Sequence, residues 1–377
     1  MSDVEIVSVE TPQQMKEFVD FPWSVYADDP NWVPPLKKVV RHLLDKNAHP
    51  FWNFSEQLLL LARRGNETVG RIAGIIDGNY NNYHRTGMGI WGFFECFDDK
   101  DAAKALFSQV EKWVSKKGMT FLRGPLNPST NYEIGMLYEG YEQPPTFMMP
   151  YNPRYYHDLV EHAGFRKEKD LQSYYVDRSW KPPEWMMKLG EKVTERGDIT
   201  VRHATIKTLE EDVRLIKSIY DQCWNRNWGY VPMTDEEAGE LTKELVKIAD
   251  PELVFFIYVN DEPVSVAMSV PDINPLLKRL NGKIGLLGLL KFLLYRKEIR
   301  GMRGLIFGIK EEYRQLGLPF VGLQYLFQVA DRTDKYHYLE LGWNLEDNEA
   351  INVLEKEGGA RPFKKYRIYR KSFADRW

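Results

Sequence analysis

Residues 310–327, KEEYRQLGLPFVGLQYLF, contain a turn with the chemistry to hold a phosphate. Arg314 supplies a positive charge, Gly317 lets the backbone approach a ligand closely, and Pro319 suits the first turn of the helical pattern that follows. The first turn of a helix has unpaired N–H groups and the positive end of the helix dipole, which together favour an anion. The competing interpretation is an ordinary strand-to-helix loop.

A second group of candidate residues lies in YHYLELGWN, residues 336–344. Alternate side chains of a strand point to opposite faces, so Tyr338 and Glu340 share the face opposite Leu339 and Leu341. A carboxylate beside tyrosines on a central strand is our candidate general base. A structural ion pair between Glu340 and a nearby basic side chain is an equally good interpretation.

The elements that must position these residues are predicted from hydrophobic periodicity. The second half of the chain has apolar β-rich runs with turn signals between them and amphipathic helical patterns that end at glycine. The predicted order is strand 199–204, helix 209–224, hairpin 253–270, strand 304–309, a helix from Pro319, strand 336–341, helix 348–358 and strand 364–371.

The first half of the chain repeats this order, and three pairs of segments resemble each other at nearly one spacing. SVYADDPNWVPP (24–35) resembles SIYDQCWNRNWGYVPM (218–233), GNETVG (65–70) resembles NDEPVS (260–265), and LVEHAGF (159–165) resembles VLEKEGGA (353–360). Duplication of one fold explains this agreement. We therefore predict domains at 1–180 and 199–377, with a linker at 181–198 that contains one short helix.

The overall composition is that of an ordinary folded protein. Of the 377 residues, 43% are apolar and 28% are charged, and the net charge of −3 does not favour nucleic-acid binding. Two cysteines cannot form a disulfide framework, the seven histidines show no metal-ligand spacing, and MSDVEIVSVE lacks the features of a signal peptide. We expect a cytoplasmic protein with no metal, no nucleic-acid partner and no membrane span.

The turn and the order of elements together resemble the GNAT acyltransferase superfamily, whose pattern is Arg or Gln, two residues, Gly, one residue, then Gly or Ala. The resemblance implies an α/β (α+β) protein of two tandem GNAT-like domains, each with a mixed, mostly antiparallel sheet flanked by helices. It implies that the pyrophosphate of acetyl-CoA or another acyl-CoA lies at this turn. The residues so assigned are Arg314, Gln315, Leu316, Gly317, Leu318 and Pro319, where Pro319 departs from the pattern and removes one N–H group.

The resemblance also assigns residues on the two neighbouring strands. It implies that backbone N–H groups of the strand carrying Phe307, Gly308 and Ile309 polarise the thioester carbonyl. Asn344 and Asn348 follow the fifth strand, where GNAT proteins bond the pantetheine arm. Simple capping of the next helix explains such asparagines equally well.

The residue that protonates the leaving thiolate in many GNAT enzymes is a tyrosine, but Leu354 stands at that place. Tyr338 or Tyr336 can substitute for it, or the thiolate can leave unprotonated. The remaining alternative is a domain that binds CoA without catalysis.

The first copy has carboxylates where the second has its phosphate turn. Alignment of FDDKDAA (97–103) with YRQLGLP (313–319) places Asp98 opposite Arg314 and Asp101 opposite Gly317. Like charges at close range disfavour a nucleotide there, although N-terminal helix capping is the better explanation of why these residues are present. We expect this copy to have a structural or acceptor-binding role.

Two further segments have open interpretations. The apolar insertion at 273–301 includes IGLLGLLKFLLY (284–295), which is too short to span a bilayer. It is interpreted as a helix packed on the core, as a lid over a bulky acyl or acceptor group, or as a helix at a membrane surface. RGPLNPSTNYEIG (123–135) has polar residues that fit either turn chemistry or an acceptor pocket, namely Asn127, Ser129, Thr130 and Asn131.

The function that these features predict is acyl-CoA-dependent N-acyl transfer. The second copy would bind the donor and pass an acetyl or longer acyl group to a small-molecule or peptide amine. The alternative is a catalytically silent tandem module that senses CoA or binds a partner.

Overall fold

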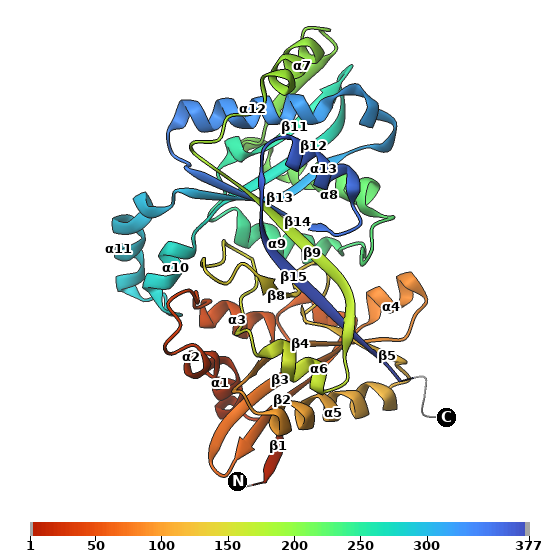
Figure 1. Cartoon of the computed structure of the whole chain (residues 1–377), viewed down its shortest axis with the longest axis vertical. Helices are drawn as coiled ribbons and strands as arrows, with labels where there is room; N and C mark the ends of the chain where they lie inside the picture. The colour runs from red at the N-terminus through yellow and green to blue at the C-terminus, as the bar shows by residue number, and fades with distance from the viewer. Residues whose placement is uncertain (1–2, 374–377) are drawn as a thin grey trace. The chain divides into compact units, whose positions relative to one another are not determined.

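The computed structural model describes residues 3–373, apart from the side chains of residues 286–289 and 293 (Figure 1). The chain divides into two compact units. The first unit comprises Met1–Leu171, Leu277–Lys291 and Lys364–Trp377, and the second comprises Gln172–Leu276 and Phe292–Phe363. Neither unit is therefore one continuous stretch of sequence.

Among the residues that the structure describes, the first unit begins with strand β1 and contains six helices of its own. Its strands are β1 (Val4–Ser8), β2 (Ser55–Arg64), β3 (Glu67–Asp77), β4 (Met88–Cys96), β5 (Phe121–Gly124), β6 (Leu126–Asn127), β7 (Glu133–Ile134) and β8 (Met136–Glu139). Its helices are α1 (Pro12–Asp20), α2 (Pro22–Val25), α3 (Lys37–Leu43), α4 (Gly78–His84), α5 (Lys100–Lys116) and α6 (Tyr156–His162), with a 3-10 turn η1 (Pro50–Asn53).

The sheet of the first unit runs in the order β1-β2-β3-β4-β5-β15, where β15 spans Arg361–Ser372, and β8 also pairs with β15. β4 and β5 are parallel, whereas β1 to β4 are antiparallel neighbours. Helix α5 covers one face because its apolar residues recur at helical spacing, and its buried side chains include Leu106, Phe107 and Val110. They pack with Ile72 and Trp91 of the sheet in one hydrophobic core.

The second unit contains the predicted phosphate turn. Its strands are β10 (Ile199–His203), β11 (Val254–Val259), β12 (Glu262–Pro271), β13 (Gly301–Ile309) and β14 (Tyr338–Leu345). Its helices are α7 (Glu184–Thr194), α8 (Leu209–Trp224), α9 (Asp235–Leu245), α12 (Leu318–Thr333) and α13 (Glu349–Glu357). Its 3-10 turns are η2 (Ile206–Thr208), η3 (Pro251–Leu253), η4 (Arg296–Glu298) and η5 (Glu311–Leu316).

The strands of the second unit follow the order β9-β14-β13-β12-β11-β10, where β9 spans Arg166–Asp177. Alternation along β11 fills both faces of this sheet, because adjacent residues of a strand point to opposite sides. Phe255 packs in a core with Val193 of α7 and Val321 of α12, whereas Phe256 packs with Ile219 of α8. Figure 1 shows α7 lying beside α12 at the top of the view.

Four elements have residues in both units: β9 (Arg166–Asp177), α10 (Asn274–Leu280), α11 (Leu286–Tyr295) and β15 (Arg361–Ser372). Within the first unit, β15 pairs antiparallel with β5, with Tyr369 opposite Gly124. The predicted division at 1–180 and 199–377 treated each copy as continuous, but the unit that begins the chain also takes in residues 277–291 and 364–377. The predicted linker contains α7, which belongs to the second unit and packs on α12.

Candidate functional site

The two central strands of the second unit separate just before the predicted phosphate turn. β13 and β14 are parallel neighbours from Gly301 opposite Tyr338 to Gly304 opposite Leu341, and their pairing does not extend to residues 305–309. On its other edge, β13 stays paired with β12 as far as Ile309. Backbone groups of residues 305–309 that point toward β14 therefore have no ladder partner on that side.

The residues predicted to polarise a carbonyl, Phe307, Gly308 and Ile309, lie in this separated part of β13. A Cβ atom at Gly308 would come within 2.3 Å of Cζ3 of Trp224, at the end of α8. Trp224 itself stacks on Tyr220, with the two ring centroids 4.8 Å apart. The absence of a side chain at Gly308 therefore lets an aromatic wall from α8 close one face of the strand.

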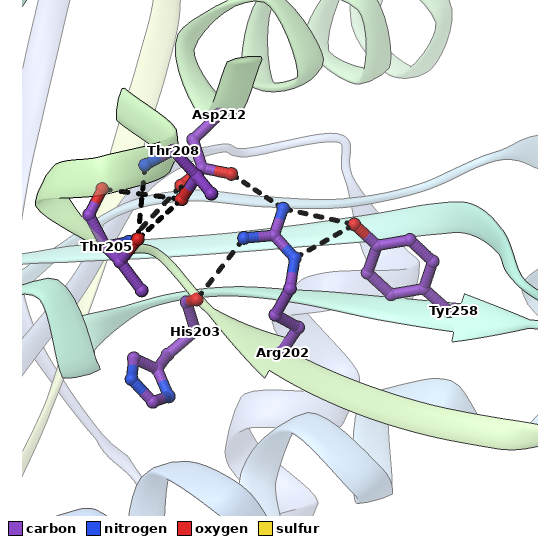
Figure 2. Close-up of polar contacts among 6 residues, drawn as sticks. All are labelled: Arg202, His203, Thr205, Thr208, Asp212 and Tyr258. Atoms are coloured by element: carbon purple, nitrogen blue, oxygen red, sulfur yellow. Dashed lines mark hydrogen bonds and ion pairs between the residues drawn. The ribbon is translucent and has the colours of Figure 1, made fainter. Parts of the chain in front are cut away.

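Helix α8 is held at its other end by a group of polar residues that Figure 2 shows. The Nη2 atom of Arg202, on β10, donates to Oδ1 of buried Asp212 at 2.6 Å, and both Nε and Nη2 donate to the hydroxyl of Tyr258 on β11. The second carboxylate oxygen of Asp212 accepts from the Thr208 hydroxyl at 2.6 Å and from the Thr205 N–H at 3.3 Å.

These contacts satisfy Asp212 from three directions, so we assign the group a structural role. The hydrogen bond to Asp212 is the main cause that raises the pKa of Arg202, which keeps the guanidinium charged. The network fixes the N-terminal turn of α8 against β10 and β11. It thereby helps to set where Trp224 lies against Gly308.

The predicted phosphate turn lies directly before helix α12. Gly317 has φ of +77°, precedes α12 directly, and follows the 3-10 turn η5 that contains Arg314 and Gln315. A Cβ at Gly317 would lie 3.0 Å from Cγ2 of Val193 on α7. Glycine is therefore favoured here both by its left-handed conformation and by a close neighbour.

The remaining residues of the turn divide into an exposed and a buried group. Arg314 is exposed, and its Nε donates to the carbonyl of Ile309 at 3.3 Å, which ties the guanidinium to the end of β13. Gln315 is also exposed, whereas Leu316 and Leu318 pack in the core beneath. Pro319 stands among the first helical positions of α12, where a missing N–H costs no intrahelical bond.

The predicted base, Glu340, is completely buried and lies in the last part of β14 before the strands separate. Its partner in the parallel register is Arg303 of β13, which is also buried, and paired residues of neighbouring strands share a face. The Nε atom of Arg303 donates to the carbonyl of Gly342 at 3.3 Å. Arg303 is thus the nearby basic residue that the alternative interpretation of Glu340 requires.

Tyr338 reaches Asp272, the residue that directly follows β12. A Cβ at Gly301 would lie 2.0 Å from Cζ of the Tyr338 ring, so the ring lies directly on this glycine. The Tyr338 hydroxyl donates to Oδ2 of buried Asp272 at 2.6 Å, and the ring stacks on Tyr175 with centroids 5.8 Å apart. Burial and the Asp272 carboxylate raise the pKa of Tyr338 well above its ordinary value, so the hydroxyl stays protonated.

Asn344 lies near the end of β14, and Asn348 follows the strand and precedes helix α13. The Nδ2 atom of Asn344 donates to Oε2 of Glu355 at 2.7 Å and to Oδ1 of Asn352 at 3.3 Å. Burial raises the pKa of Glu355 to about 8. The hydrogen bond from Asn344 lowers this pKa, but by less than burial raises it. Asn348 is the N-cap residue of α13 but makes no side-chain capping bond, and Leu354 is partly buried on the same helix.

In the first unit, side chains occupy the N-terminus of helix α5 and one backbone N–H group of strand β4. Helix α5 is capped by Asp99, which directly follows the predicted Asp98, and the Asp99 carboxylate also accepts from Arg64 at 2.6 and 3.0 Å. The N–H of Phe93, on β4, donates to the side chain of Asn127 at 2.7 Å. A carboxylate therefore stands at this helix N-terminus, and an amide oxygen occupies one N–H group of β4.

The polar residues predicted around a possible acceptor pocket in the first unit fit turn chemistry. Asn127 also donates through Nδ2 to Glu133 at 2.6 Å, and the N–H of Asn131 donates to the Ser129 hydroxyl at 3.3 Å. Both are short-range contacts that stabilise the loop after β5.

Comparison with known proteins places the chain in a family. No protein-family model matches it. The chain is 30% identical over 382 residues to a protein named bacterial ceramide synthase from Caulobacter vibrioides, and the match covers 98% of each chain. The chain belongs to the family of this protein. Protein YghO of Escherichia coli is 30% identical as well, over 95% of this chain and 92% of its own.

Solved structures agree on the fold. A tandem GNAT protein from the clavulanic acid biosynthesis pathway, solved without acetyl-CoA, matches with a TM-score of 0.56 at 10% identity, over 98% of both chains. This likeness confirms the predicted tandem GNAT fold for the family member described here. It covers both units, in agreement with the duplication that the three pairs of similar segments predicted.

Proposed function

We propose that the protein is an acyl-CoA-dependent N-acyltransferase whose donor binds in the second unit. The observation that carries the proposal is the separation of β13 from β14 directly before the glycine turn of α12. A linear thioester arm can lie between separated strands, and its phosphates can lie at the helix N-terminus beyond them. Arg314 and Gly317 fit this use, because one supplies charge and the other allows close approach.

The proposed reaction forms a C–N bond and breaks the thioester C–S bond. Backbone N–H groups of Phe307 to Ile309 would stabilise negative charge on the carbonyl oxygen. Glu340 would accept the proton of the attacking amine, and Arg303 stands opposite it in the strand register. The thiolate would leave with a proton from Tyr338 or unprotonated, since Leu354 offers none.

The proposed substrates are a fatty acyl-CoA and a long-chain amino alcohol. A ceramide is the amide of a fatty acid with such an amine, and the Caulobacter relative bears the name of a ceramide synthase. Each methylene buried from water contributes about 0.8 kcal/mol, so a pocket for several carbons would favour long over acetyl donors. We expect the affinity to rise from acetyl-CoA to longer acyl-CoA.

The test combines product analysis with titration calorimetry. Mass spectrometry should detect an amide when the protein is given a fatty acyl-CoA and a sphingoid base, and calorimetry should give one CoA site per chain. Arg314→Glu should weaken CoA binding severely. The matched control is Asp99→Asn, which removes a charge at the corresponding helix of the first unit and should leave the affinity unchanged. Equal losses from both variants, or two sites per chain, would contradict a single donor site.

A second candidate function is a silent module that binds CoA without transfer, and Leu354 at the usual place of the acid favours it. This candidate predicts normal calorimetry and no amide with any amine offered. Retention of CoA binding without turnover would therefore separate it from the enzyme.

A further inference from the structure

The insertion between β12 and β13 carries a concentration of positive charge in an otherwise acidic protein. Residues 274–300 contain seven lysines and arginines and one glutamate, whereas the whole chain has a net charge of −3. Six of these basic side chains are exposed, namely Lys278, Arg279, Lys283, Arg296, Lys297 and Arg300. They lie on both sides of α11 in the sequence, so the helix is flanked by cations.

Apolar side chains between these cations are exposed as well. Ile284 is 67% exposed, Leu290 is 53% exposed and Leu294 is 62% exposed. Leu290 and Leu294 are four residues apart in α11, so they lie on the same face of the helix. Core packing therefore does not account for these three residues, although it was one of the interpretations of the segment.

The start of the insertion is held firmly within the first unit. The indole Nε1 of Trp23 donates to Oδ1 of Asn281 at 2.7 Å, and the N–H of Lys37 donates to the carbonyl of Gly282 at 3.0 Å. Gly282 has φ of +80°, and a Cβ there would lie 2.4 Å from the Trp23 ring. The ammonium of Lys278 donates to the carbonyl of Pro30. The exposed apolar residues thus follow an anchored turn.

We propose that α11 and its flanking residues bind the surface of an anionic lipid bilayer. A short apolar helix bordered by lysine and arginine can lie in the plane of the interface, with leucine side chains among the acyl chains and the cations at the headgroups. Basic residues beside such a helix are attracted by anionic lipids. Among the described residues, no helix is long and apolar enough to cross the bilayer, so contact would be at its surface.

The experiment is co-sedimentation of the full chain with vesicles of phosphatidylcholine, with and without phosphatidylglycerol, in the absence of any substrate. Wild-type protein should bind the vesicles that contain phosphatidylglycerol, and binding should fall as salt is raised. Leu290→Asp with Leu294→Asp should reduce the partition coefficient by roughly tenfold or more, because two charges replace the inserted apolar groups. Lys283→Glu with Lys297→Glu should reduce it similarly.

The matched control is Ile206→Asp, which places the same charge on an apolar residue that is 84% exposed elsewhere in the chain. This variant should bind vesicles as the wild type does, and all variants should keep the wild-type circular dichroism spectrum, since every altered side chain is exposed.

The proposal is overturned if phosphatidylglycerol does not increase the binding of wild-type protein to vesicles, or if the α11 variants bind as strongly as the wild type. It is also overturned if the α11 substitutions instead change the mass seen in analytical ultracentrifugation, because the face would then bind a second copy. Calorimetry with CoA is independent of all these results.

Discussion

Gly317 provides a quantitative test of the phosphate turn. Its φ of +77° costs a residue with a Cβ about 1–2 kcal/mol. A Cβ would also meet Cγ2 of Val193 at 3.0 Å, and valine has little rotamer freedom to move away. Overpacking of this kind adds about 1–3 kcal/mol, so Gly317→Ala should lose more stability than backbone strain alone explains.

Gly197 is the matched control, because its φ is +80° and nothing lies within 4 Å of a Cβ placed there. Gly197→Ala should lower the melting temperature slightly and leave CoA affinity unchanged. Gly317→Ala should lower the melting temperature further and weaken CoA binding roughly tenfold, equivalent to about 1.4 kcal/mol, because the turn must shift away from α7.

Calorimetry and thermal melts on a third variant complete the test. Adding Val193→Ala to Gly317→Ala removes the close contact, so most of the lost affinity should return. If Gly197→Ala weakens CoA binding as much as Gly317→Ala, the turn has no special part in binding. If Val193→Ala restores nothing, the steric argument is wrong.

Three further predictions concern the strands and helices around this turn. Glu340→Gln should lower turnover in initial-rate assays with little change in CoA affinity, and a folded variant with full turnover would assign the base elsewhere. Gly308→Ala should destabilise the protein in thermal melts, and Trp224→Leu should partly rescue it, because the indole lies where the new methyl group would be. Glu355 has a pKa raised by burial from its ordinary 4.5 to about 8, so the unfolded chain ionises first as pH rises. The free energy of unfolding should therefore fall from about pH 4.5 to 8 in urea titrations, and Glu355→Gln should flatten that fall.

Local elements of the second unit were predictable because their signals are local. The hairpin at 253–270 appears as β11 and β12, the helix predicted from Pro319 begins one residue earlier as α12, and the strand predicted at 364–371 lies within β15. Periodicity, turn residues and proline placement depend only on the few residues involved. The same reasoning placed Gly317 in a turn directly before a helix.

Contacts between distant segments were not predictable in this way. Alternation showed that Tyr338 and Glu340 share a face, but it contained no signal that Tyr338 would lie on Gly301 and reach Asp272. Capping preferences pointed to an aspartate at the start of α5, but they gave no sign that the cap, Asp99, would also accept hydrogen bonds from Arg64 on β2. The alternation of side chains along a strand gives the face on which each residue lies. It does not give the register with the neighbouring strand, which determines the side-chain partners.

The membership of strand β15 in the first unit bears on how the chain folds as it is made. Nascent chains tend to fold domain by domain from the N-terminus during synthesis. Here the edge of β5 meets its partner in residues 369–372, which leave the ribosome after almost all of the second unit. One edge of β5 therefore stays unpaired until residues 369–372 have been synthesised, and exposed strand edges promote aggregation. A chain stopped before residue 361 would leave that edge open permanently.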